Sequence, residues 1–157
     1  MPPQFLFDIS GIDLNHDIYD QEAIRKINPH RGDMEHLNGI VYVDQSKGRL
    51  IGYKNVRKEE FWVPGHIPGR PVLPGVLMLE TAAQLASFYT HVFAGWTGFI
   101  GFAAADGVKF RQQVVPGDRL YIIGEQVWER HGRLQCRVQG LVMGNVVFEA
   151  KVTGTQL

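Results

Sequence analysis

Apolar residues in this 157-residue chain follow short alternating stretches separated by glycine, proline and polar turns. The clearest alternation places Leu134, Cys136 and Val138 on one face of a strand, with polar residues between them on the other face. Polar residues 45–49 separate two such stretches and predict a hairpin. The expected strands are 39–44, 50–57, 99–105, 107–115, 119–128, 133–142 and 146–152. This pattern predicts a sheet of five to seven mostly antiparallel strands.

One segment has a different pattern. Residues 76–94 contain no proline or glycine and are rich in Leu, Ala and Met, which predicts one long helix that stops at Gly95. Pro74-Gly75 is a plausible start signal. The segment is apolar nearly all round, so we expect the helix to be buried. A shorter helix is expected at 19–27. The fold class is therefore α+β, with a sheet wrapped around one helix.

Composition narrows the class of protein. Sixteen Lys and Arg balance sixteen Asp and Glu, which excludes a general nucleic-acid binder. The single cysteine, Cys136, excludes a disulfide framework and is expected in the core. The first ten residues lack the pattern of a signal peptide, and polar residues interrupt the long helix, so we expect a cytoplasmic protein with no membrane span. The length predicts one domain, residues 1–157.

The first 23 residues form an acidic lead-in. No Lys or Arg precedes Arg25, and we expect a solvated arm or a first helix. The acidic residues before Arg25 are Asp8, Asp13, Asp17, Asp20 and Glu22. The aromatic residues Phe88, Tyr89, Phe93, Trp96, Phe99 and Phe102 are expected to fill the core, with some of them available to line a tunnel.

Three features in and before the long helix can carry chemistry. Glu80 lies among apolar residues in the second turn of the helix. Burying the charge of its carboxylate would cost several kcal/mol, which favours the protonated form that a general acid requires. His66 lies in a loop stiffened by prolines and glycines, which can hold a base in one place. The helix start at Gly75 offers free N–H groups that can polarise a carbonyl.

Together these groups suit proton abstraction next to a carbonyl, with loss or gain of a β-hydroxyl, better than nucleophilic acyl transfer. His30 and His36 flank two acidic residues without a recognised metal-ligand spacing, and no phosphate-binding motif is present. We therefore expect neither a metal nor a cofactor.

The segment GHIPGRPVLPGVLMLETAAQ (65–84) closely resembles the signature of FabZ-type 3-hydroxyacyl-[acyl-carrier-protein] dehydratases. The upstream INPHRGDMEHLNGIVYVD and the downstream VKFRQQVVPGDRL resemble two further segments of that family, in the same order. The resemblance implies the hot-dog fold, in which a curled antiparallel sheet wraps around a long central helix.

The resemblance also implies a reaction, the dehydration of (3R)-3-hydroxyacyl thioesters to trans-2-enoyl thioesters in type II fatty acid or lipid biosynthesis. It implies dimers, assembled in some members as trimers of dimers, whose active sites are shared between subunits. His66 and Glu80 then match the catalytic base and acid, and Gly75 matches the donor to the thioester carbonyl. Further residues are expected to bind substrate: Ile67, Pro74, Val76, Gln84 and Phe110.

The implied partner is acyl carrier protein, which is acidic, and Arg70, Lys109 and Arg111 are candidates to bind it. Departures from the family pattern occur at Ile67, at residues 62–64 and at residues 32–36. Two alternatives stay open at this point. One is a hot-dog thioesterase that uses Glu80 to activate water, and the other is a non-catalytic acyl-binding subunit.

Overall fold

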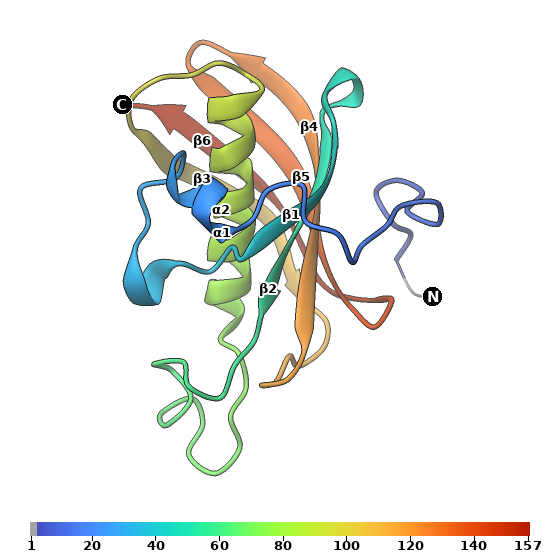
Figure 1. Cartoon of the computed structure of the whole chain (residues 1–157), viewed down its shortest axis with the longest axis vertical. Helices are drawn as coiled ribbons and strands as arrows, with labels where there is room; N and C mark the ends of the chain where they lie inside the picture. Colours follow the sequence, from blue (N-terminus) through green and yellow to red (C-terminus); the bar gives the residue numbers. More distant parts are fainter. Residues whose placement is uncertain (1–2) are drawn as a thin grey trace.

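Within residues 3–157, which the computed structural model describes, six strands form one antiparallel sheet that curves around a long helix (Figure 1). The strand order in the sheet is β1-β2-β4-β5-β6-β3. The strands are β1 (Gly39–Asp44), β2 (Arg49–Asn55), β3 (Ile100–Phe110), β4 (Arg119–Arg130), β5 (Arg133–Val142) and β6 (Asn145–Gln156). The α+β class and the sheet around one helix are confirmed.

The long helix, α2 (Gly75–Val92), lies along the concave face of the sheet (Figure 1). It starts after Pro74, whose extended backbone precedes the first helical residue. Leu85 and Phe88 are almost fully buried against the strands. The helix ends before Gly95, which adopts a positive φ of 74°. Within the part of the chain described, no helix is long and apolar enough to cross a membrane.

Strand β3 differs from the sequence-based expectation. In place of the two strands expected at 99–105 and 107–115, one strand runs from Ile100 to Phe110 and bulges between Asp106 and Lys109, and residues 111–115 lie outside it. Gly107 lies in the bulge with a φ of 58°, so the glycine that suggested a break instead permits an irregularity within the strand. β3 is at the sheet edge, where Phe99 is 69% and Phe102 47% exposed. Phe99 therefore does not fill the core as expected, whereas Phe102 lines the cavity described below, which is the other role expected for these aromatic residues.

The N-terminal segment lies on the opposite face of the sheet from α2 (Figure 1). Phe7 is buried there in a second apolar cluster with Val41, Ile51 and Ile123. The amide of Gln139 ties the segment down, since its Oε1 accepts from Leu6 N at 2.9 Å and its Nε2 donates to the Gln4 carbonyl at 2.8 Å. The expected solvated arm is therefore wrong for Leu6 and Phe7, although the aspartates of this segment are exposed.

Three short helical segments lie in the N-terminal third of the chain. α1 (Gln21–Arg25) is shorter than the helix expected at 19–27, and Asp20 caps it by accepting from Ala23 N at 2.9 Å. The 3-10 helix η1 (Gly32–Met34) follows in the loop to β1, and η2 (Gln45–Lys47) forms the turn between β1 and β2. The loop between α1 and β1 lies beside α2, and it contributes residues to the site described next.

Candidate active site

A cavity of about 250 Å³ follows one side of α2. Its walls come from α2, from strands β3, β5 and β6, and from the loop that carries His30. The lining residues on α2 run from Glu80 to Thr90, which corresponds to about 15 Å along the helix axis. Most of the lining is apolar or carries small side chains, so the cavity suits an extended apolar chain.

Glu80 is the acidic residue in this wall. Its side chain is 24% exposed, so it faces the cavity and is less enclosed than its apolar sequence neighbours suggested. Gln84 Nε2 lies 3.4 Å from Glu80 Oε1, and His30 Nε2 lies 3.8 Å from the same oxygen. One carboxyl oxygen therefore faces two nitrogen atoms of the protein.

Gln84 is buried one helical turn after Glu80, with 2% exposure. Its Oε1 accepts from the backbone N–H groups of His36 and Leu37 at 3.0 and 3.1 Å. Its Nε2 donates to the Met34 carbonyl at 2.7 Å. Gln84 thus joins α2 to the loop before β1. A direct contact of Gln84 with substrate stays a prediction, and the structure gives this residue a supporting position next to Glu80.

His66 lies in the loop between β2 and α2, which extends beyond the N-terminal end of α2 (Figure 1). The His66 side chain is exposed, and its Nδ1 lies 2.7 Å from the Val72 carbonyl oxygen. Backbone bonds from His66 N to the Trp62 carbonyl (2.8 Å) and from Val72 N to the His66 carbonyl (2.9 Å) fix the loop. Because a carbonyl can only accept, Nδ1 carries a proton, and in the neutral ring Nε2 then has the lone pair that a general base requires.

Within one chain, His66 does not line the cavity that Glu80 lines. The structure brings together two other predicted residues, since the ring of Phe110 lies over Gly75, 2.8 Å from where a Cβ would stand. Gly75 is the first residue of α2, where backbone N–H groups have no acceptor within the helix. Ile67, Val76 and Phe110 are all at least half exposed, at 53%, 67% and 50%, and Pro74 is half-buried.

The sequence analysis missed a buried polar cluster at the start of the His66 loop. Lys54 Nζ lies 2.5 Å from Glu60 Oε1 and 3.1 Å from His36 Nδ1. Burial lowers the pKa of Lys54. Burial and the Lys54 charge lower the pKa of His36 to about 4. Burial alone would raise the pKa of Glu60, but the hydrogen bonds from Lys54 and from Arg57 N lower it.

A sequence signal for this cluster does exist. Lys54 shares a strand face with Leu50 and Gly52, and Leu50 is a core residue. A lysine on the inward face of a strand needs a buried partner.

The three basic residues expected to bind a partner are exposed around the His66 loop and the end of β3. Arg70 Nη2 lies 3.4 Å from Gln113 Oε1. Arg111 forms an ion pair with Glu149 at 2.9 Å. Lys109 is exposed near the end of β3. Their exposure is what a docking surface needs, and the partner itself stays a prediction.

The remaining candidates for chemistry are the single cysteine and side chains that could bind a metal ion. Cys136 is buried, and burial raises the pKa of its thiol to about 12, which confirms a core cysteine. Across residues 3–157, no group of three His, Cys, Asp or Glu side chains is placed to hold a metal ion.

A curled antiparallel sheet around one long helix, with a cavity beside that helix, defines a hot-dog protein. The description of the family model that matches residues 28–151 is FabA-like domain. The chain belongs to this FabA-like family.

Curated relatives agree with that assignment. The chain is 42% identical over 104 residues to the 3-hydroxyacyl-[acyl-carrier-protein] dehydratase FabZ of Desulforamulus reducens, covering 66% of this chain and 72% of the relative. It is 35% identical over 134 residues to the protein of the same name from Listeria monocytogenes, covering 85% of this chain and 92% of the relative.

Solved structures share the fold at low sequence identity. The dehydratase heterocomplex ApeI:P from Xenorhabdus doucetiae matches with a TM-score of 0.70 and 15% identity, over 85% of this chain and 90% of that one. The protein Cj0977 from Campylobacter jejuni matches with a TM-score of 0.66 and 13% identity, over 90% of this chain and 95% of that one. Both support the hot-dog fold.

Proposed function

We propose that this protein is a 3-hydroxyacyl-[acyl-carrier-protein] dehydratase of type II fatty acid or lipid biosynthesis, acting in the cytoplasm. The observation that carries the proposal is the position of Glu80 in the wall of a mostly apolar cavity that follows α2. A cavity of this kind can hold an acyl chain with its reacting carbons beside a carboxyl group. The names of the relatives support this substrate class.

The chemistry follows from three groups. His66 Nε2 removes the proton from the carbon next to the thioester carbonyl. The backbone N–H of Gly75 stabilises the negative charge that develops on the carbonyl oxygen. Glu80 gives a proton to the departing β-hydroxyl, so that water leaves and a trans-2-enoyl thioester remains. The thioester itself acidifies the carbon–hydrogen bond, and the reaction as written uses only side chains and backbone of the protein.

We further propose that two copies of the chain complete each active site. His66 is exposed on its loop, whereas Glu80 lies in the cavity, so a second subunit is needed to bring the two groups together. The edge strand β3 offers the surface for this pairing, because it has unpaired backbone groups and exposed aromatic side chains. Further association into a trimer of dimers is compatible with this interface.

The acyl group is expected to arrive on acyl carrier protein. Arg70, Lys109 and Arg111 provide positive charge on the exposed surface around the His66 loop, which suits an acidic carrier. The acyl chain would enter from this side, pass the N-terminal end of α2 and extend along the cavity. Ile67, Pro74, Val76 and Phe110 would then line its path.

The test is the reversible hydration of a crotonyl thioester by the wild type and by the variants His66→Ala and Glu80→Gln. We expect each variant to lose about 100-fold or more of the activity while it remains folded. Near wild-type rates in both folded variants would overturn the assignment. Release of free thiol from saturated acyl thioesters would instead indicate a thioesterase, and tight acyl binding without any product would indicate a non-catalytic subunit.

A further inference from the structure

A second ionisable side chain lies in the wall of the cavity that Glu80 faces. His30 Nε2 is 3.8 Å from Glu80 Oε1, and the two side chains are 27% and 24% exposed. This distance is long for a hydrogen bond. Catalytic contacts, however, are often long in the free enzyme and tighten when substrate binds. His30 is therefore within reach of the carboxyl group that is proposed to act as the acid.

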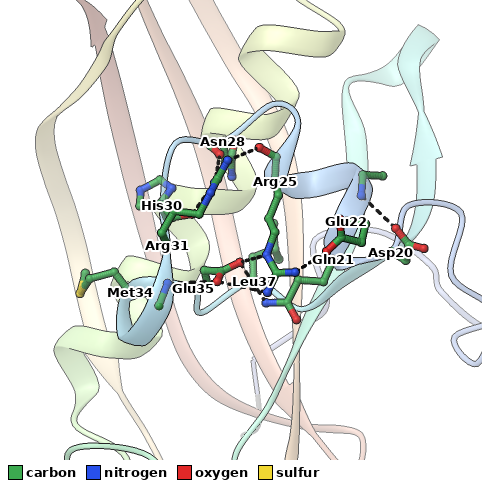
Figure 2. Close-up of polar contacts among 12 residues, drawn as sticks. Asp20, Gln21, Glu22, Arg25, Asn28, His30, Arg31, Met34, Glu35 and Leu37 are labelled. Atoms are coloured by element: carbon green, nitrogen blue, oxygen red, sulfur yellow. Dashed lines mark hydrogen bonds and ion pairs between the residues drawn. The ribbon is translucent and has the colours of Figure 1, made fainter.

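The loop that carries His30 is held by contacts that leave the imidazole ring free. The Arg31 guanidinium donates to the carbonyls of Asn28, His30 and Arg25 at 2.9, 2.6 and 2.9 Å. Arg25 is also paired with Glu35 at 2.6 Å. Figure 2 shows the ring of His30 pointing away from the Arg25–Glu35 pair. The backbone that carries His30 is thus fixed by contacts that do not use its ring.

The same loop is attached to α2 on both sides of His30. Asn28 Nδ2 donates to the Gln84 carbonyl at 2.9 Å, and the side chain of Gln84 bonds to residues 34–37. Gln84 Nε2 also reaches Glu80 Oε1 at 3.4 Å. The nitrogen atoms of His30 and Gln84 therefore converge on the same oxygen of Glu80. The other carboxyl oxygen, Oε2, remains for the substrate.

The second ring nitrogen of His30 has a distinct environment. Nδ1 is buried and has no hydrogen-bond partner among the described residues. A buried N–H without an acceptor is costly, and the neutral ring needs a proton on only one nitrogen. The tautomer with its proton on Nε2 avoids that cost and directs its N–H at Glu80.

We propose that His30 is a positioning residue for Glu80. Together with Gln84 it holds Oε1, so that Oε2 faces the hydroxyl group of the substrate. When Oε2 gives its proton to the leaving hydroxyl, the carboxylate that forms is stabilised by two N–H donors on Oε1. This inference rests on the proposed dehydratase function and assigns a role to a residue outside the proposed catalytic pair.

Two amide variants of the full-length protein test the role. Glutamine extends its N–H group to about the position of Nε2, whereas asparagine ends near Nδ1. We expect His30→Asn to lower kcat by about 10- to 100-fold with KM nearly unchanged, because a misplaced acid affects the chemical step. We expect His30→Gln to retain kcat within about threefold. His16→Gln, an exposed histidine in the N-terminal segment, is the matched control.

The double variant His30→Asn/Glu80→Gln separates positioning from a general structural effect. If His30 acts through Glu80, the His30→Asn change adds no further loss once Glu80 is replaced. An equal loss in both backgrounds would overturn the proposal, and so would a folded His30→Asn variant with wild-type kcat. In either case, a large loss of dehydratase activity in Glu80→Gln alone would still support the dehydratase assignment. Only wild-type activity in both Glu80→Gln and His66→Ala would overturn that assignment.

Discussion

Lys54 and Glu60 form a buried ion pair, 2.5 Å between Nζ and Oε1, at the start of the loop that carries His66. Their side chains are 3% and 9% exposed. Glu60 Oε2 also accepts from Arg57 N at 2.9 Å, and the Glu60 carbonyl accepts from Val63 N at 3.1 Å. The loop that carries His66, exposed at its tip, is thus fixed at its base by a buried ion pair.

Replacing Lys54 tests this fixation. Lys54→Met leaves the buried Glu60 carboxylate without its cationic partner, which we expect to lower the free energy of unfolding by about 3–5 kcal/mol. Urea denaturation measures the change. In the double variant Lys54→Met/Glu60→Leu no unpaired charge is left, and much of the stability should return. Equal losses in the single and double variants would show that the charge pair does not govern the loop.

His36, next to Lys54, makes stability depend on pH. Its pKa is lowered from 6.5 to about 4, so the unfolded chain binds the proton more readily. The neutral form of buried His36 therefore adds its full contribution to the free energy of unfolding above pH 6.5. This contribution is lost as the pH falls from 6.5 through about 4. The loss amounts to about 3 kcal/mol. We expect His36→Asn, which keeps an acceptor for Lys54 but does not titrate, to show a flatter stability profile between pH 7 and 4.5, measured by denaturation at each pH. A profile as steep as that of the wild type would contradict this.

Ser87 lies midway along the α2 wall of the cavity. Ser87→Phe fills the space beyond it, so we expect activity on a four-carbon thioester to persist while activity on chains of ten or more carbons falls at least about tenfold. A panel of thioesters from four to sixteen carbons, analysed by mass spectrometry, measures the effect. Ser87→Ala adds no volume and serves as the control. A uniform effect on all chain lengths would argue that the acyl chain follows another path.

The exposed edge strand gives a prediction about assembly. Phe102 on β3 is 47% exposed, and Phe102→Lys places a charge in the proposed interface. We expect the dimer to dissociate, as measured by light scattering after size-exclusion chromatography. Met143→Lys, at a turn where the side chain is 90% exposed, is the control and should remain dimeric. A stable dimer in Phe102→Lys would exclude this edge as the interface.

Arg111 allows a test of the carrier-protein surface. Reversing its charge in Arg111→Glu should weaken catalysis on carrier-protein substrates several-fold, mostly in KM, and leave a small thioester unaffected. Arg133→Glu, at the exposed start of β5, is the control for net charge. An equal effect on both substrates would remove Arg111 from the docking surface.

Much of the fold could be predicted because its signals are local. The absence of proline and glycine from residues 76–94 indicated α2, and the alternation around Cys136 indicated β5. The continuity of β3 could not be predicted in this way, since Gly107 reads as a break in sequence and becomes a bulge only when β6 pairs with the strand on both sides of it. The packing of Phe7 depends on a sheet face built from distant segments.

The residues of the candidate site likewise fall into those that the sequence could predict and those that it could not. His66, Gly75 and Glu80 could be picked out because they lie within one continuous segment. The placement of His30 beside Glu80 could not, since it depends on a loop 50 residues upstream that is held by Gln84. Lys54 and His36 likewise come together only through the register of β2 and the course of the preceding loop.

The N-terminal segment occupies the convex side of the sheet, and this limits the surfaces left for the proposed association of subunits. Because Phe7 packs against Val41 and Ile123, the convex side exposes the aspartates of the N-terminal segment to solvent instead of an apolar sheet surface. This cover works against back-to-back stacking of two sheets, while the edge of β3 stays unpaired and is the proposed interface. The N-terminal segment thus covers an apolar face of the sheet and leaves β3 free for the proposed pairing that brings His66 and Glu80 together.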